Sequence, residues 1–215
     1  VAGSINILKV MKKVSCNEII FSSSATVYSD SNLPPYSETD VVSPVSTYGR
    51  TKLMVESILA DGVASNEANR VVILRYFNPV GAHQSGLIGE DPKGTPNNLM
   101  PLIAQVAQKK HDNLFIYGDD YLTRDGTGER DYIHVTDLAD GHVKAIEKIS
   151  LLNRLQVLNL GTGKGTTVRE LISMFEKTNN VSVSTKVVNR RAGDVAKSYA
   201  TASLAYELLG FECKK

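Results

Sequence analysis

The sequence predicts an α/β fold in which a parallel β-sheet is joined by helical crossovers. Three short, largely apolar runs, at 18–23, 71–74 and 156–160, have the length of buried strands, and the first is rich in β-branched residues. Helical patterns precede and separate these runs, and most connections are short. Strands that follow one another through helices lie parallel, so this order of elements favours a parallel sheet.

The first half of the chain alternates between helices and strands. A helix is expected at the start because Ile5, Leu8 and Met11 share one face. The second helix begins at Ser46 or Thr47, either of which is a good N-cap. In order, the expected elements are a helix at 1–13, a strand at 18–23, a helix at about 47–64, a strand at 71–74 and a long loop at 82–97.

The second half continues this alternation. Pro101 is compatible with the first turn of a helix, and Thr136 or Asp137 is expected to cap another. Residues 167–170 have the capping-box form. The expected elements are a helix at 98–109, a strand at 114–118, a loop at 119–129, a helix at 137–149, a strand at 156–160, a helix at 168–177, a strand at 181–188 and a helix at 201–209.

Charge and cysteine content argue against several classes of protein. The 215 residues are 42% apolar and 22% charged with a net charge of +1, which argues against nucleic acid or an anionic membrane as the main partner. No apolar stretch is long enough to span a bilayer. Cys16 and Cys213 belong to no paired motif, so free thiols in a reducing cytosol are expected. The histidines show no metal-ligand spacing, and His134 is expected to form structural hydrogen bonds.

A serine run and a tyrosine–lysine pair mark the expected reaction centre. Ser24 ends the run after the 18–23 strand, where open α/β sheets bind their ligands. Tyr48 and Lys52 lie one turn apart on one face of the 47–64 helix. An ammonium at roughly 6 Å is expected to favour the phenolate by about 2 pH units, so Tyr48 is predicted to exchange protons near neutral pH. The alternative is an amphipathic helix that carries a Tyr and a Lys by chance.

Residues 161–166 form a glycine-containing segment between a strand and a helix. A phosphate-binding turn is one interpretation of such a segment. However, the third glycine comes too early for a dinucleotide fingerprint, and the ending of a P-loop is absent from the sequence. We therefore expect a tight turn with a left-handed glycine rather than a cofactor site.

With these stretches in view, the sequence resembles the UDP-glucose 4-epimerases of the extended short-chain dehydrogenase/reductase superfamily over essentially its whole length. The Tyr48-x-x-x-Lys52 pair is typical of the superfamily as a whole. The segments at 78–82 and 96–101 are far more specific to this epimerase family. Further matching stretches lie at 22–28, 75–77, 89–92, 125–128 and 130–135.

The resemblance implies a reaction and a set of roles. Tightly held NAD removes a hydride from the sugar C4 and returns it to the other face of a 4-keto sugar, without net oxidation. Tyr48 is implied as the acid/base, Ser24 as its hydrogen-bond partner, and Lys52 as a ligand of the NAD ribose. The implied cofactor-binding residues are Ser22, Ser23, Tyr48, Lys52, Tyr76, Phe77 and Pro79. The implied UDP-sugar-binding residues are Ser24, Asn78, Asn98, Leu99, Phe115, Tyr117, Arg130, Arg191, Asp194 and Ser198.

The resemblance also implies the domain organisation: the C-terminal part of a Rossmann-type doubly wound parallel sheet plus a smaller α/β substrate-binding domain. Residues 1–80 and about 130–161 are assigned to the dinucleotide-binding domain, and 81–129 and 162–215 to the nucleotide-sugar-binding domain. The glycine-rich NAD fingerprint is expected ahead of Val1, so the chain is expected to be a fragment that is inactive and poorly folded alone. The full-length protein is expected to be a cytoplasmic homodimer of galactose metabolism.

Two departures and two alternatives bear on this assignment. Ser29 replaces a common glycine, whereas Ser198 replaces the bulky tyrosine of some members and leaves room for a 2-acetamido group. A dehydratase on the same scaffold fits less well because residues 24–26 lack an acidic pair. A non-catalytic sugar-nucleotide-binding domain has no need of an activated phenol. A surface ion pair for Arg191 and ordinary core packing for Phe77 are the competing interpretations of those two residues.

Overall fold

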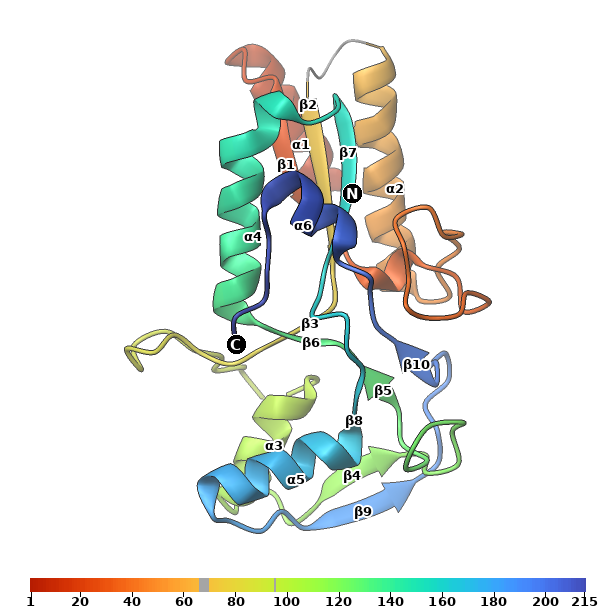
Figure 1. Cartoon of the computed structure of the whole chain (residues 1–215), viewed down its shortest axis with the longest axis vertical. Helices are drawn as coiled ribbons and strands as arrows, with labels where there is room; N and C mark the ends of the chain where they lie inside the picture. Colours follow the sequence, from red (N-terminus) through yellow and green to blue (C-terminus); the bar gives the residue numbers. More distant parts are fainter. Residues whose placement is uncertain (66–69, 95) are drawn as a thin grey trace.

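The computed structural model describes residues 1–65, 70–94 and 96–215, and it confirms an α/β fold. Figure 1 shows a larger body above, built on a sheet between helices, and a smaller body below with two helices and a second sheet. Short strands run between the two bodies.

The larger body is built on three parallel strands, all of which the sequence predicts with small differences at their ends. Their order in the sheet is β1, β2, β7. Because the strands are parallel, their carboxyl ends lie at one edge of the sheet, which is where ligands bind in such folds. The strands are β1 (Glu18–Ser22), β2 (Arg70–Tyr76) and β7 (Leu155–Leu160).

Side chains of β2 alternate between two hydrophobic cores, one on each face of the sheet. Val71 and Ile73 pack in a core with residues of the first two helices. Val72 and Leu74 pack in a core with residues of the other two helices of this body. Because alternate residues face different cores, all four residues at 71–74 are apolar. The helices are α1 (Ala2–Lys13) and α2 (Thr47–Ala64) on one face, and α4 (Val135–Lys148) and α6 (Ser203–Leu209) on the other.

The smaller body has a core of its own, to which Ile103, Ile116 and Ile172 contribute. Its second helix begins with the predicted capping box, in which the Thr167 and Glu170 side chains each accept the backbone N–H of the other residue. The strand predicted at 181–188 is shorter than expected. The elements are α3 (Leu99–Ala107), β4 (Leu114–Tyr117), α5 (Val168–Asn179) and β9 (Thr185–Val188), with β4 and β9 parallel.

Five very short strands, which the sequence analysis does not predict, run between and beside the two bodies. Each has only two or three residues, so no hydrophobic period marks it, and pairing with distant segments creates it. They are β3 (Asn78–Val80) paired with β6 (Tyr132–His134), and β5 (Glu129–Arg130) between β8 (Thr166–Thr167) and β10 (Lys197–Ser198).

Two expectations about helix ends and domain boundaries need correction. Neither Thr136 nor Asp137 caps α4, because the imidazole Nδ1 of His134 accepts the backbone N–H of Thr136 at 3.2 Å. His134 is therefore a structural hydrogen bonder, as predicted. The segment 203–211, assigned by sequence to the smaller domain, packs in the core of the larger body.

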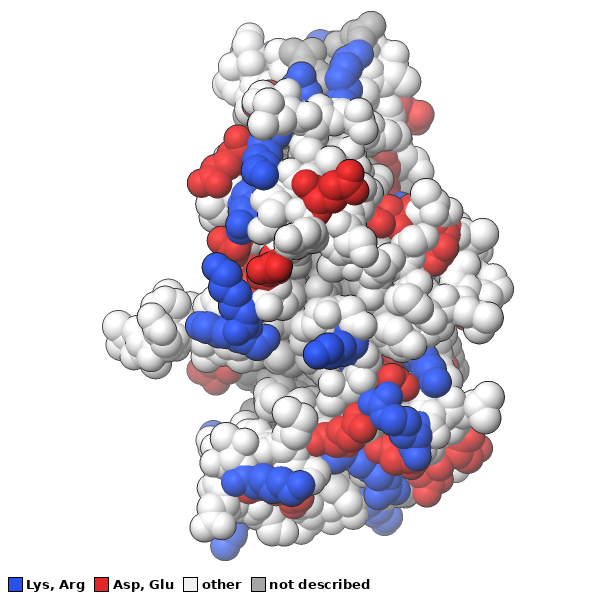
Figure 2. Space-filling view, in the orientation of Figure 1, with Lys and Arg blue, Asp and Glu red and all other residues white. Residues whose placement is uncertain are grey.

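The surface carries charges of both signs, and both thiols are free. Figure 2 shows basic and acidic side chains interspersed over the face in view. Cys16 and Cys213 are free thiols, as predicted, and burial raises the pKa of Cys213 to about 12. Within the described residues, every helix is too short or too polar to cross a membrane.

Candidate active site

The three serines at the end of β1 have different surroundings. The Ser22 hydroxyl lies 2.9 Å from Nε2 of His142. Ser23 is fully buried, and its hydroxyl donates a hydrogen bond to the Glu56 carboxylate. Ser24, by contrast, lines a cavity. Ser23 therefore points into the interior, whereas Ser24, though only 8% exposed, lines the cavity.

Tyr48 and Lys52 lie together on one face of α2, as their spacing predicts. The Lys52 Nζ lies 5.5 Å from the centroid of the Tyr48 ring and 5.1 Å from that of Phe21. The same ammonium donates a hydrogen bond of 2.7 Å to the backbone oxygen of Ser22. Tyr48 itself is 53% exposed. The phenol is thus accessible, beside a positive charge that is fixed to the end of β1.

A central cavity of about 440 Å³ lies next to the end of β1. Ser24 lines it, and so does Ser46, which caps α2 two residues before Tyr48. Tyr48 and Lys52 are not among its lining residues, so the cavity reaches the start of α2 but does not enclose the pair. Other predicted site residues that line the central cavity are Tyr76, Phe77, Asn78, Arg130, Arg191, Asp194 and Ser198.

A second, outer cavity of about 220 Å³ lies in the smaller body. Both cavities are lined by Asn78, Arg130, Arg191 and Asp194, so they adjoin one another. Further predicted residues of the outer cavity are Pro79, Asn98, Leu99, Phe115 and Tyr117. Of the predicted site residues, Ser22, Ser23, Tyr48 and Lys52 lie outside both cavities.

Two arginines stand where the cavities adjoin. The Arg130 guanidinium lies 3.6 Å from the Asp194 carboxylate and donates a hydrogen bond of 3.0 Å to the backbone oxygen of Glu129. The guanidinium carbon of Arg191 lies 3.8 Å from the centroid of the Tyr117 ring. Arg191 lines both cavities, and among the described residues no carboxylate forms an ion pair with it. This junction is suited to a bound anion.

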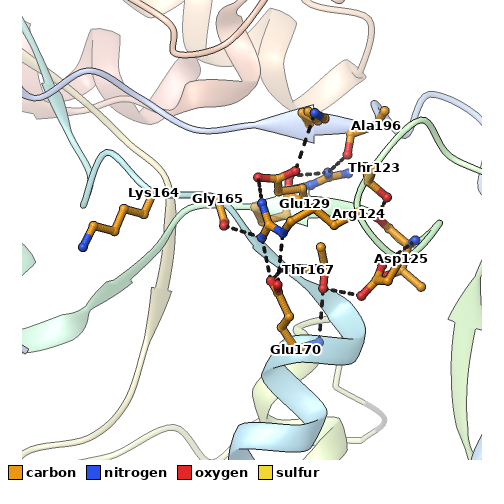
Figure 3. A network of polar contacts seen from close by, with 12 residues as sticks. Thr123, Arg124, Asp125, Glu129, Lys164, Gly165, Thr167, Glu170 and Ala196 are labelled. Carbon is orange, nitrogen blue, oxygen red and sulfur yellow. Dashed lines mark hydrogen bonds and ion pairs between the residues drawn. The ribbon is translucent and has the colours of Figure 1, made fainter.

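A polar network surrounds Glu129 of β5, the residue before Arg130 (Figure 3). Arg124 donates hydrogen bonds to Glu129 at 2.8 Å and to Glu170 at 2.6 Å. The hydrogen bond from Arg124 to Glu170, together with the backbone N–H of Thr167, lowers the pKa of Glu170 to about 2. Lys197 of β10 lies 3.9 Å from the second oxygen of Glu129. Residues 119–129 are expected to form a loop, and their sequence does not indicate this network.

The segment at 161–166 is a tight turn, as predicted. Gly163 has a φ of +77°, which favours glycine. The backbone N–H groups of Thr162 and Gly163 donate hydrogen bonds of 2.8 and 3.1 Å to the carboxylate of Asp131. The Asp131 carboxylate therefore occupies the place where a phosphate would bind the N–H groups of this turn.

A buried ion pair near the serines is also missed by the sequence analysis. Arg75 of β2 and Glu56 of α2 are each 5% exposed, and Arg75 Nη2 lies 2.7 Å from Glu56 Oε2. A signal for it exists, because charged residues inside an apolar strand and an apolar helix face are rarely buried without a partner.

Comparisons with known proteins identify a family and several relatives of this chain. The family described as "NAD dependent epimerase/dehydratase family" matches residues 1–161. The UDP-glucose 4-epimerase of Haemophilus influenzae is 49% identical over 216 residues, covering 100% of this chain and 64% of that protein. The UDP-glucose 4-epimerase of Bacillus subtilis is 47% identical over 213 residues, covering 99% of this chain and 63% of that protein. The chain thus spans somewhat less than two thirds of the length of these curated relatives.

Solved structures show the same fold. A UDP-glucose-4-epimerase from Stenotrophomonas maltophila, with bound NAD and formylated UDP-arabinopyranose, superposes with a TM-score of 0.96 at 50% identity. The alignment covers 100% of this chain and 64% of that one. A UDP-glucose 4-epimerase from Bifidobacterium longum, in complex with NAD+ and UDP, gives a TM-score of 0.93 at 46% identity, with 99% and 63% covered.

Proposed function

Because the chain belongs to the NAD dependent epimerase/dehydratase family, we propose that the whole protein is a UDP-glucose 4-epimerase, which interconverts UDP-glucose and UDP-galactose. The supporting observation is a pair of adjoining cavities, with Ser24 in the central one and the aromatic Phe115 and Tyr117 in the outer one. Two arginines stand between them. A planar base, a diphosphate and a sugar fit this order of surfaces.

The outer cavity is proposed to bind the nucleotide. Phe115 and Tyr117 would contact the uracil, and Asn98 and Leu99 would line the same end. Arg130 and Arg191 suit the diphosphate because a planar guanidinium gives two charge-assisted hydrogen bonds. The proposed remaining contacts of the substrate are Asn78, near the sugar, and Asp194, at the uridine ribose.

The central cavity is proposed to hold the sugar. The Ser24 hydroxyl accepts hydrogen bonds from the backbone N–H and the hydroxyl of Thr26, at 3.2 and 3.0 Å. Its own proton is therefore left for another acceptor, which we propose is the oxygen on the sugar C4. Tyr48 is proposed to exchange the proton of that oxygen, next to the ammonium of Lys52. Ser198 would lie beside the sugar ring.

The residues present fit NAD. The Lys52 ammonium has three N–H donors and one described hydrogen bond, to the Ser22 backbone, so donors remain for ribose hydroxyls. Tyr76, Phe77 and Pro79 would form a wall for the nicotinamide. The hydroxyls of Ser22 and Ser23 already bond His142 and Glu56, so we propose that these two serines act through their position in the strand. When bound, NAD accepts a hydride from the sugar C4 and gives it back.

Domain roles, assembly and location follow from the same assignment. We propose that the larger body belongs to the dinucleotide-binding domain and the smaller one to the nucleotide-sugar-binding domain. The whole protein is proposed to act in galactose metabolism as a cytoplasmic homodimer without nucleic-acid or membrane partners. The mixed charges in Figure 2 support the absence of a nucleic-acid partner, and the exposed Ile7 and Val10 of α1 support a dimer.

The test uses the full-length protein with UDP-galactose that carries deuterium at C4. Epimerisation by removal and return of the same hydride predicts UDP-glucose that keeps the deuterium at C4, without any added oxidant. Loss of the label to water would contradict the proposal, because a hydride held by the nicotinamide does not exchange with solvent. Release of a dehydrated sugar would favour a dehydratase. Binding of UDP without any turnover would favour the non-catalytic binding domain.

A further inference from the structure

Two side-chain contacts, one helical turn apart, hold α2 against the serine run. The Lys52 ammonium bonds the Ser22 backbone oxygen at 2.7 Å. One turn further along the helix, the Glu56 carboxylate accepts the hydroxyl proton of Ser23. Both helix residues lie on the face that begins with Tyr48, because positions four apart share a face.

The first turn of α2 also lies directly against the turn that follows the serines. A Cβ on Gly49 would lie 2.3 Å from the backbone oxygen of Thr26, so only glycine permits this approach. Thr26 is in turn the residue that hydrogen-bonds Ser24 at 3.0 and 3.2 Å. More than one contact therefore holds α2, which carries Tyr48, against the end of β1, which Ser24 follows.

Glu56 is itself fixed from the neighbouring strand. Arg75 donates to Oε1 at 3.1 Å through Nε and to Oε2 at 2.7 Å through Nη2, which is a bidentate pair. Burial lowers the pKa of Arg75, but the hydrogen bonds to Glu56 outweigh it and raise this pKa above its ordinary value. The backbone N–H of Ser23 also bonds the Leu74 oxygen of β2, at 2.8 Å. The carboxylate thus joins β1, β2 and α2.

We propose that Glu56, held by Arg75, is a positioning residue that sets the distance between the Ser24 hydroxyl and the Tyr48 phenol by fixing Ser23. Ser23 and Ser24 are neighbours in an extended segment, so fixing the first side chain inward directs the second outward. This inference rests on the proposed function.

A contribution to stability alone is the competing explanation. Replacing a buried ion pair by apolar residues of similar volume is often neutral or stabilising, so stability does not by itself account for the pair. What a bidentate pair provides is a defined geometry. The inference therefore predicts an effect on turnover that differs from the effect of lost stability.

The main test variant is Ser23→Ala in the full-length protein, with Glu56→Gln as a second variant that keeps the side-chain shape. We expect the kcat for UDP-galactose to fall by about tenfold or more while KM changes by less than about twofold. The matched control is Val63→Ala, which removes packing from the same helix two turns beyond Glu56. Its Tm is expected to fall while its kcat at a temperature well below that Tm stays unchanged.

A double-variant cycle separates positioning from a general effect. If Ser23 acts through Ser24, then Ser23→Ala is expected to change kcat by less than about twofold in a Ser24→Ala background. An equal loss in both backgrounds, or a wild-type kcat for Ser23→Ala and Glu56→Gln, would overturn the inference. Absence of epimerase activity in the unaltered protein would instead refute the proposed function.

Crystal structures decide the matter independently of activity. In the Ser23→Ala protein, the position of Ser24 relative to Tyr48 is expected to shift from that in the unaltered protein. An unchanged position of both residues would overturn the inference even if the protein has another activity.

Discussion

The carboxylate of Asp131 accepts both the backbone N–H and the hydroxyl of Thr162, at 2.8 and 2.7 Å. Its second oxygen accepts the N–H of Gly163. Asp131 is fully buried, and burial raises its pKa although these hydrogen bonds oppose the rise. Because Asp131 lies next to Arg130 and Thr162 follows β7, this contact joins the junction of the two cavities to the main sheet.

Asp131→Asn is expected to destabilise the full-length protein by about 2 kcal/mol, because an amide N–H would then face a backbone N–H in a buried site. Urea unfolding followed by circular dichroism measures this change. Asp140→Asn, at a half-exposed carboxylate of α4, is the control and is expected to change stability by less than about 0.5 kcal/mol. A loss for Asp131→Asn no larger than that of the control would contradict this account of the turn.

The main fold is predictable from local patterns. Two kinds of local signal are present in the sequence because each depends only on neighbouring residues. They are the apolar runs of β1, β2 and β7 and the capping box of Thr167 and Glu170. The short strands and the cap by His134 are different, because they depend on partners or geometry that no period encodes.

The site shows the same division. Tyr48 and Lys52 are found together because helical spacing alone places them on one face. Glu56 and Arg75 escape the sequence analysis because their contact joins a helix to a strand 19 residues away. Their charges in apolar segments indicate that each needs a partner, but not which one.

The pair of Glu170 and Arg124 predicts a defined pH dependence of stability. The pKa of Glu170 is about 2 in the folded protein against an ordinary value of 4.5, mainly because Arg124 hydrogen-bonds the carboxylate. A lowered pKa stabilises the folded state fully above about 4.5, and this contribution is lost as the pH falls toward about 2. The Glu170 side chain is 42% exposed, so the contribution is expected to be no more than about 1 kcal/mol.

Thermal unfolding from pH 7 to pH 2 checks this dependence. Glu170→Gln is expected to lower Tm at pH 7 and to approach the unaltered protein at pH 2. Glu147→Gln, at an exposed carboxylate of α4, is the control. If the difference caused by Glu170→Gln were constant across the pH range, the ion pair would not be its source.

Tyr48→Phe is expected to lower the kcat for UDP-galactose by about a hundredfold or more, because the proton of the sugar oxygen loses its exchange partner. KM and the Kd of UDP are expected to stay within about twofold, since the Tyr48 ring lies outside the outer cavity, which is proposed to bind the nucleotide. Tyr206→Phe, at an exposed tyrosine of α6, is the control. A kcat close to that of the unaltered protein would exclude Tyr48 as the acid/base.

Arg191→Lys is expected to weaken UDP binding by about tenfold, because an ammonium lacks the planar fork and the stacking on Tyr117. The neighbouring Arg190 offers a matched control. Its guanidinium carbon stacks on Tyr121 at 4.1 Å and it pairs with Asp120, but it does not line either cavity. Calorimetry of UDP binding is the measurement. Equal losses for Arg190→Lys and Arg191→Lys would indicate that Arg191 has a surface role only.

Ser198 predicts which sugars the central cavity accepts. It lies on β10, opposite Arg130, and its small side chain lines the cavity. We expect the full-length protein to epimerise UDP-N-acetylgalactosamine as well as UDP-galactose, because space remains for a 2-acetamido group.

Ser198→Tyr is expected to lower kcat/KM for the acetamido sugar by about tenfold or more, while kcat/KM for UDP-galactose stays within about threefold. Ser198→Ala, which adds no volume, is expected to retain both activities. Undetectable turnover of the acetamido sugar by the unaltered protein would show that another residue closes this side of the cavity.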